Sequence, residues 1–268
     1  MILNGKSIEK LIKDNILIEK ANVKNIHSSS YDVTTSNHIL RFKTTKKDVS
    51  LIDADFINDM YEEIDISDGY KFKPGECILI ALEEQFNIPD YICASIRGRT
   101  SFNRLGIFIS SQHLNPGYRG KLNITIFNNS KNTYILIPNL QIAQVIFESM
   151  DDKVDESLLY YNEKNPSYQN EDGLKGSKIY KDYIGKVVRH FKGNYYYIDN
   201  ICMDSETKKY VVVYKTLYNR EDSNIWVRPA EMFFETIDAK RKDNVTKQKH
   251  RFEIVDDLTV DYTSKNSK

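Results

Sequence analysis

The residues from Ile96 to Gly106 carry the kinds of side chain that bind phosphate. They read I-R-G-R-T-S-F-N-R-L-G, so that arginines, two hydroxyls and glycines lie together. Arginine binds phosphate oxygens through paired hydrogen bonds, and hydroxyls and backbone N–H groups bind the oxygens that remain. The segment therefore predicts a phosphate-binding loop. A second segment, Asn115 to Gly120, reads N-P-G-Y-R-G and predicts a tight turn.

The elements that must position these segments are short β-strands. Alternating or continuous apolar runs are separated by Pro, Gly and Asn turns, which is typical of an all-β sandwich or barrel. The expected strands cover 70–73, 77–82, 121–127, 134–137 and 142–147. A short amphipathic helix with Ser7 as its N-cap is expected before them.

The chain is expected to divide after residue 182. Residues 158–181 lose the apolar periodicity and predict a long irregular arm. A second small β-rich domain is expected over 184–255, with a hairpin at Gly193-Asn194. Residues 256–268 are polar and predict a disordered tail.

Composition limits the classes of function. The net charge is zero, and the mild basic excess within 180–252 is more typical of a solvated face than of a nucleic-acid contact. The three cysteines form no C-x-x-C pair, so neither a disulfide framework nor a zinc site is indicated. No apolar run approaches the ~18 residues of a membrane span, and no signal peptide begins the chain. We expect a cytoplasmic protein without a membrane partner.

The first 182 residues resemble the dCTP deaminase branch of the dUTPase superfamily. The matching segments occur in the family's order: S-Y-D-V at 30–33, F-K-P-G-E at 72–76, G-R-T-S-F-N-R-L-G at 98–106, N-P-G-Y-R-G at 115–120, the strand that contains Gln144, and the arm at 166–182. The resemblance implies a distorted, jelly-roll-like β-barrel. It also implies a homotrimer that binds a deoxynucleoside triphosphate with Mg²⁺ at sites between subunits.

The resemblance also implies which residues hold the nucleotide. These residues would be Arg99, Thr100, Ser101, Arg104, Asn115, Gln144 and Tyr168. In the arm, Ser167 and Glu171 replace a usual lysine and a usual glutamine. The zinc signature H-x-E…P-C-x-x-C is absent, so we expect no zinc and no other metal site built from side chains. Mg²⁺ would come with the phosphates.

Two departures from the family concern catalysis. Thr125 stands where deaminases have a glutamate that acts as general base, and Asn115 stands where dUTPases have an aspartate that activates water. Neither side chain accepts a proton near pH 7. His113 is a candidate substitute acid or base, whereas Glu83 and Glu84 are interpreted as surface carboxylates.

Three functions therefore stay open. The first is a nucleotide-binding protein with impaired catalysis that senses, sequesters or regulates through its nucleotide. The second is an active dCTP deaminase or dUTPase with an unconventional base. The third is a nucleic-acid-associated protein that uses the basic second domain, and the phosphate-loop pattern disfavours it.

The second domain resembles a small bacterial domain family of unknown function. The shared pattern includes H-F-K-G at 190–193 and W-V-R-P at 226–229. His190, Lys192, Trp226 and Arg228 are candidates for a cationic, aromatic-lined pocket that binds an anion or a base. The alternative is that Trp226 belongs to the core and the charges lie at its rim.

Overall fold

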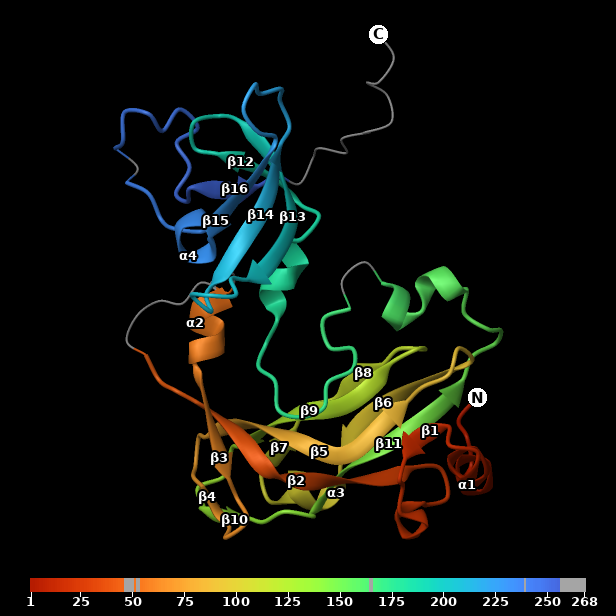
Figure 1. Cartoon of the computed structure of the whole chain (residues 1–268). Coiled ribbons are helices and arrows are strands. Elements are labelled where there is room, and N and C mark those ends of the chain that lie inside the picture. The colour runs from red at the N-terminus through yellow and green to blue at the C-terminus, as the bar shows by residue number, and fades with distance from the viewer. Residues whose placement is uncertain (46–50, 52–53, 164–165, 239, 256–268) are drawn as a thin grey trace. The chain divides into compact units, whose positions relative to one another are not determined.

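The computed structural model describes residues 1–45, 51, 54–163, 166–238 and 240–255, and it divides the chain into two compact units. Unit 1 comprises residues 1–45 and 60–176, and unit 2 comprises residues 46–59 and 177–268 (Figure 1). The predicted disordered tail, 256–268, lies outside the described residues. Within the described ranges, no helix is long and apolar enough to cross a membrane.

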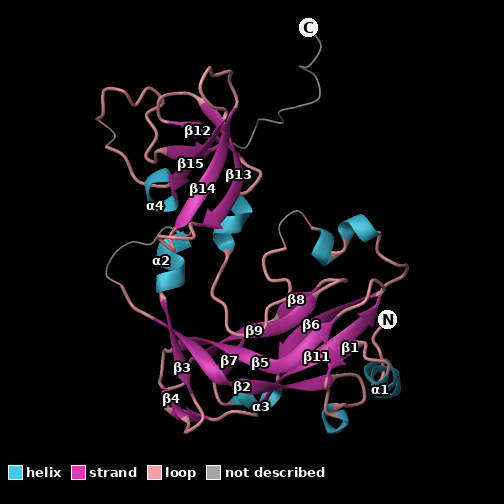
Figure 2. Ribbon diagram, in the orientation of Figure 1, coloured by secondary structure: helices cyan, strands magenta, loops and turns pink. Residues whose placement is uncertain are grey.

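Unit 1 is built on a curled antiparallel sheet (Figure 2). The strands follow the order β7-β9-β5-β2-β11-β6-β8, with β1 on β5 and β3 on β2, and β10 pairs with β4 in a small second sheet. Its strands are β1 (Leu17–Glu19), β2 (Tyr31–Phe42), β3 (Tyr61–Asp65), β4 (Tyr70–Phe72), β5 (Cys77–Asn87), β6 (Ile92–Gly98), β7 (Ile107–Ile109), β8 (Gln112–Leu114), β9 (Arg119–Asn128), β10 (Tyr134–Leu136) and β11 (Gln141–Ser149). Its helices are α1 (Gly5–Lys13), η1 (Val23–Asn25), α3 (Thr100–Arg104), η2 (Glu156–Leu158) and η3 (Tyr160–Asn162).

Alternation along the strands decides which side chains enter the core of unit 1. In β9, Leu122, Ile124 and Ile126 are buried in the main apolar cluster. Successive strand residues point to opposite faces, so Asn123 and Thr125 lie on the other face of β9. The mainly β fold expected from this alternation is confirmed.

The first helix begins earlier than the sequence suggested. Asn4 is the N-cap of α1, and its side chain accepts a hydrogen bond from the backbone N–H of Ser7 at 3.0 Å. The prediction that Ser7 caps this helix is therefore wrong. Ile8 and Ile12 are its buried residues, which attach the helix to the core.

Unit 2 is a five-stranded antiparallel sheet in the order β15-β14-β13-β12-β16. Its elements are α2 (Ala54–Asp59), η4 (Ile179–Tyr183), β12 (Val187–His190), β13 (Tyr195–Met203), β14 (Tyr210–Thr216), β15 (Ile225–Pro229), α4 (Ala230–Phe233) and β16 (Phe252–Ile254). The hairpin predicted at Gly193 joins β12 to β13, and this glycine has a φ of 97°, which favours Gly. The rings of Phe233 and Phe252 stack at 4.0 Å in the core.

One element of unit 2 comes from the middle of unit 1's sequence. The helix α2 lies between β2 and β3 along the chain, yet Ala54 is fully buried in the core of unit 2. The Asp55 carboxylate accepts a hydrogen bond from the backbone N–H of Tyr210 at 3.0 Å. No pattern in the sequence indicates this exchange.

Candidate functional site

The predicted phosphate loop follows β6 directly and forms the short helix α3. Thr100, Ser101 and Arg104 are exposed on it. A Cβ atom on Gly98 would lie 3.0 Å from the Cβ of Ile109, so the loop begins at a close approach that favours glycine. These side chains are therefore presented to solvent, where a ligand can reach them.

A buried carboxylate organises the base of this loop. Asp32, on β2, is fully buried and accepts a hydrogen bond from the Gln144 amide of β11 at 3.1 Å. Its other oxygen lies 3.5 Å from Nη1 of Arg99 and 3.1 Å from Nε2 of His27. The structure thus brings together two predicted nucleotide ligands, Arg99 and Gln144. The sequence analysis did not identify Asp32 and His27 as site residues, although S-Y-D-V contains Asp32.

Arg99 differs from Arg104 in its surroundings. Nη1 of Arg99 donates to the backbone carbonyl of Gln141 at 2.9 Å, and 32% of its side chain is exposed. Arg104 is exposed in the last turn of α3. Arg99 therefore fixes the loop against the sheet, whereas Arg104 is free to turn toward a ligand.

A cavity of about 930 Å³ adjoins Arg99. Phe102, Gln141 and Glu84 also line it. Glu84 is only 7% exposed and accepts hydrogen bonds from the backbone N–H and the hydroxyl of Thr34. Burial raises the pKa of the Glu84 carboxyl above its usual value. The interpretation of Glu84 as a surface carboxylate is wrong, because it satisfies the Thr34 N–H inside the fold.

The two positions where the family has its catalytic carboxylates lie on β9 and in the turn before it. Thr125 donates its backbone N–H to the hydroxyl of Ser110 at 2.9 Å. The carbonyl of Asn115 accepts a hydrogen bond from the N–H of Tyr118 at 3.1 Å, which closes the predicted turn. His113 is exposed on β8.

The arm after η3 lies along the start of β9. The N–H of Lys121 donates to the carbonyl of Glu171 at 2.7 Å, and the N–H of Asn170 donates to Arg119 at 2.8 Å. A Cβ atom on Gly120 would lie 2.8 Å from the backbone nitrogen of Glu171, so only glycine permits this approach. Tyr168 donates its N–H to the hydroxyl of Tyr160 at 3.0 Å, and its side chain is 39% exposed.

Glu171 has an unusual position for a carboxylate. It is 7% exposed, and Oε2 accepts a hydrogen bond from the Asn123 amide at 3.3 Å. Asn123 precedes Thr125 by two residues and therefore shares its face of β9. A buried carboxylate thus lies beside the strand position where the family has its general base.

The turn and the phosphate loop lie at opposite ends of β6. Leu114 pairs with Ala94, near the start of β6, whereas Arg99 follows the end of this strand. A strand rises by about 3.3 Å per residue, so Asn115 and Arg99 are about 20 Å apart along β6. A single chain therefore does not bring Asn115 to the phosphate loop.

The comparisons with known proteins match this architecture. Residues 2–150 match the family described as dCTP deaminase-like, which is more than half of the chain. The chain belongs to the dCTP deaminase-like family. Residues 186–254 match DUF1653, a family of unknown function. The resemblances expected from the sequence are therefore confirmed for both parts of the chain.

Relatives of this dCTP deaminase-like protein cover about two thirds of it. A protein of Nanoarchaeum equitans named "dCTP deaminase, dUMP-forming" is 32% identical over 205 residues, which are 69% of this chain and 100% of the relative. A protein of the same name from Sulfurihydrogenibium is 29% identical over 184 residues, which are 68% of this chain and 99% of the relative. The crystal structure of the deaminase from Agrobacterium tumefaciens is 22% identical with a TM-score of 0.47, and covers 58% of this chain and 50% of that one.

The surroundings of Asp32 do not favour a metal ion bound by side chains. In the part of this dCTP deaminase-like chain that the structure describes, no three His, Cys, Asp or Glu residues are grouped to hold a metal. A cation at Asp32 would face the Arg99 guanidinium, which lies 3.5 Å from this carboxylate. Any Mg²⁺ would therefore have to arrive on the phosphates of a nucleotide.

The four candidates in unit 2 separate into two pairs. Lys192 forms an ion pair with Asp243 at 3.2 Å, and the Trp226 indole N–H donates to the carbonyl of Ser223 at 3.0 Å. Both side chains thus have structural partners. His190 and Arg228 are considered below.

Proposed function

We propose that this protein binds a deoxynucleotide at a site shared between the chains of a homotrimer and holds it with little turnover. The observation that carries the proposal is the buried Asp32, which fixes Arg99 and Gln144 behind the exposed Thr100, Ser101 and Arg104. Such a loop presents hydroxyls and a guanidinium to phosphate oxygens. A protein that retains its nucleotide would sense, sequester or regulate through it.

The expected loss of turnover follows from the chemistry of deamination. Water must lose a proton as it attacks the pyrimidine ring, and general-base catalysis contributes about 10²–10⁴-fold to such a step. Thr125 and Asn115 supply a hydroxyl and an amide, which do not accept that proton near pH 7. The nucleotide would therefore be bound by the scaffold and left intact.

A second candidate function is an active deaminase or dUTPase. The observation that favours it is Glu171, whose buried carboxylate contacts Asn123 on the same face as Thr125. The carboxylate missing from β9 would then be supplied by the arm. Turnover in the unmodified protein that disappears in Glu171→Gln would support this candidate over the first.

The shared site predicts a trimer in solution. Because Asn115 and Arg99 lie about 20 Å apart along β6, residues of neighbouring chains must meet to complete one site. Light scattering at micromolar concentration should give about three times the chain mass of 31.3 kDa. A mass of one chain would contradict both the trimer and the shared site.

Arg104 should contribute to affinity without contributing to stability. We expect Arg104→Ala to weaken dCTP or dUTP binding by about 1.5–3 kcal/mol, the range for hydrogen bonds to charged groups, with no change in the unfolding transition. Calorimetry measures the affinity. Lys10→Ala, which removes an exposed cation from α1, is the matched control and should leave binding unchanged. Equal affinities in wild type and Arg104→Ala would show that the loop does not contact phosphate.

A further inference from the structure

Arg228 is the arginine of unit 2 whose charge the fold leaves uncompensated at the edge of the core. Its Nε–H is buried and has no hydrogen-bond partner among the residues that the structure describes. A buried donor without a partner costs free energy unless water or a ligand satisfies it. The arginine is therefore a candidate ligand-binding group.

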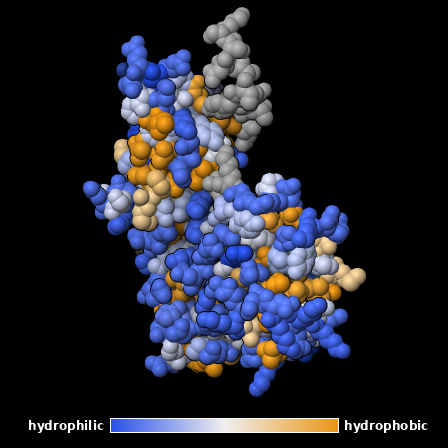
Figure 3. Space-filling view, turned by 45° about the vertical axis from the view of Figure 1, so that its right-hand side comes forward, coloured by the Kyte–Doolittle hydropathy of each residue, from blue (hydrophilic) through white to orange (hydrophobic). Residues whose placement is uncertain are grey.

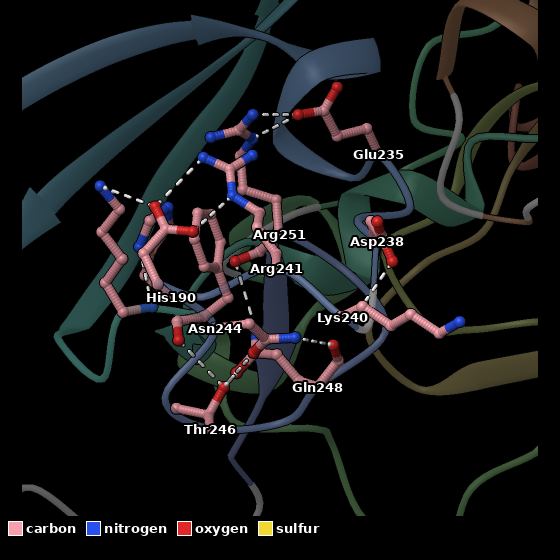
Figure 4. Close-up of polar contacts among 12 residues, drawn as sticks. His190, Glu235, Asp238, Lys240, Arg241, Asn244, Thr246, Gln248 and Arg251 are labelled. Carbon is pink, nitrogen blue, oxygen red and sulfur yellow. Dashed lines mark hydrogen bonds and ion pairs between the residues drawn. The ribbon is translucent and has the colours of Figure 1, made fainter.

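The carboxylates near this region are already engaged. Glu235 pairs with Arg251, and Asp243 pairs with Arg241 at 2.6 Å and with Lys192 at 3.2 Å (Figure 4). Each of these acids thus has a cation of its own. An anion that neutralises Arg228 would have to come from outside this group.

His190 faces the same side of the sheet as Arg228. His190 follows Val188 by two residues in β12, and Arg228 pairs with Val212 across β14 and β15. Val188 and Val212 both lie in the core of unit 2, so His190 and Arg228 point toward the core side. Arg189, whose Nε is also buried without a partner, precedes His190 and points to the opposite side.

His190 is placed to donate a hydrogen bond. Its Nδ1 accepts the backbone N–H of Lys192 at 3.3 Å, so the proton of the neutral ring is on Nε2. Burial lowers the pKa of His190 to about 4, and the charges of Arg251, Arg228 and Lys192 lower it further than the opposing Asp243 raises it. The imidazole is therefore neutral at pH 7 and lies in an uncompensated positive field.

Aromatic rings border this pair of donors. The Tyr196 ring contacts those of Phe252, at 5.4 Å, and of Tyr214, at 5.5 Å, and its hydroxyl pairs with that of Tyr218 at 2.9 Å. Tyr196, Tyr218 and Trp226 are partly exposed. Apolar residues also interrupt the hydrophilic surface of unit 2 (Figure 3). Partly exposed rings next to cationic donors suit a base with an attached phosphate, because bases stack on aromatic side chains.

We propose that unit 2 binds the phosphate group of a small nucleotide through Arg228 and His190, with the base against the neighbouring aromatic rings. This site is distinct from the deoxynucleotide site of unit 1 and does not depend on it. Two N–H groups of the guanidinium and the Nε2–H of His190 would donate to phosphate oxygens. The bound anion would favour the protonated imidazole and raise the pKa of His190.

The test follows the titration of His190 by NMR in the full chain, labelled at histidine. Without ligand, Arg228→Gln should raise the titration midpoint of His190, because one of the lowering charges is removed. Cytidine monophosphate at about 10 mM, tenfold above a dissociation constant of 1 mM, should raise the midpoint in wild type and leave it unchanged in Arg228→Gln. Inorganic phosphate should act in the same direction with a smaller shift.

Two further variants separate this site from others. Lys209→Gln removes a cation of unit 2 that pairs with Glu231, and Arg104→Ala removes a cation of the unit 1 loop; both should respond to the nucleotide like wild type. A shift that is lost in Arg104→Ala would assign the effect to unit 1 and overturn the proposal. No shift with either ligand, or a shift with a short oligothymidylate alone, would overturn it as well.

Discussion

Thr125→Glu should deaminate dCTP about 10²–10⁴ times faster than the unmodified chain, the contribution of a positioned general base. The reason is local: Thr125 lies on β9 with Asn123 and faces away from the apolar cluster, so a longer carboxylate side chain is accommodated on that face. The measurement is the conversion of dCTP to its uracil product, followed by chromatography. Asn115→Asp is the corresponding change for dUTP hydrolysis.

The control for this gain is Thr125→Gln, which has nearly the shape of glutamate but accepts no proton. It should be as inactive as wild type. If wild type already turns over dCTP or dUTP at about 1 s⁻¹ or faster, an ordinary enzyme rate, the protein does not merely hold its nucleotide. Loss of that rate in Glu171→Gln would identify the arm carboxylate as the base, and loss in His113→Ala would identify the histidine.

Asp32→Ala should destabilise unit 1 by about 3 kcal/mol and weaken nucleotide binding at the same time. Removing one partner of a buried ion pair costs about 3–5 kcal/mol. The lower end applies here because 32% of the Arg99 side chain is exposed and can be solvated. Without the carboxylate, Arg99 and Gln144 lose their common partner, and the phosphate loop loses its support. Urea denaturation and calorimetry on the same preparation measure the two effects.

Asp32→Asn separates the charge from the shape. The amide can still meet Gln144, so most of the loss in this variant would come from the electrostatic contact with Arg99 and His27. Ser149→Ala, which removes a surface hydroxyl that contacts Met1, should leave both quantities unchanged. An Asp32→Ala protein with unaltered stability and affinity would show that this carboxylate does not position the loop.

Strands and turns were predictable because their signals are local. The alternation in 121–127 and the Pro-Gly turn at 74–75 are visible in any short window of sequence, and β9 and the turn before β5 follow them. The meeting of Asp32 with Gln144 was not predictable in this way. These residues are 112 positions apart, and only the pairing of β2 with β11 brings them together.

The candidates in unit 2 show a related limit. Residue type identified four cationic or aromatic side chains, but whether each is available depends on partners far along the chain. Asp243 engages Lys192 from 51 positions away, and no carboxylate does the same for Arg228 within the described residues. Sequence patterns indicate which side chains could bind; the structure decides which of them are already bound.

The exchange of α2 has a consequence for synthesis of the chain. Ala54 completes the core of unit 2, yet its buried partners in that core begin at Tyr180. At 5–20 residues per second, the helix leaves the ribosome roughly 6–25 s before those partners exist. During that interval α2 has no surface of its own unit to cover it, and the nascent unit 1 must fold around a loop left open. The small buried side chain of Ala54 suits such a wait, because it exposes little apolar surface to misdirected contacts.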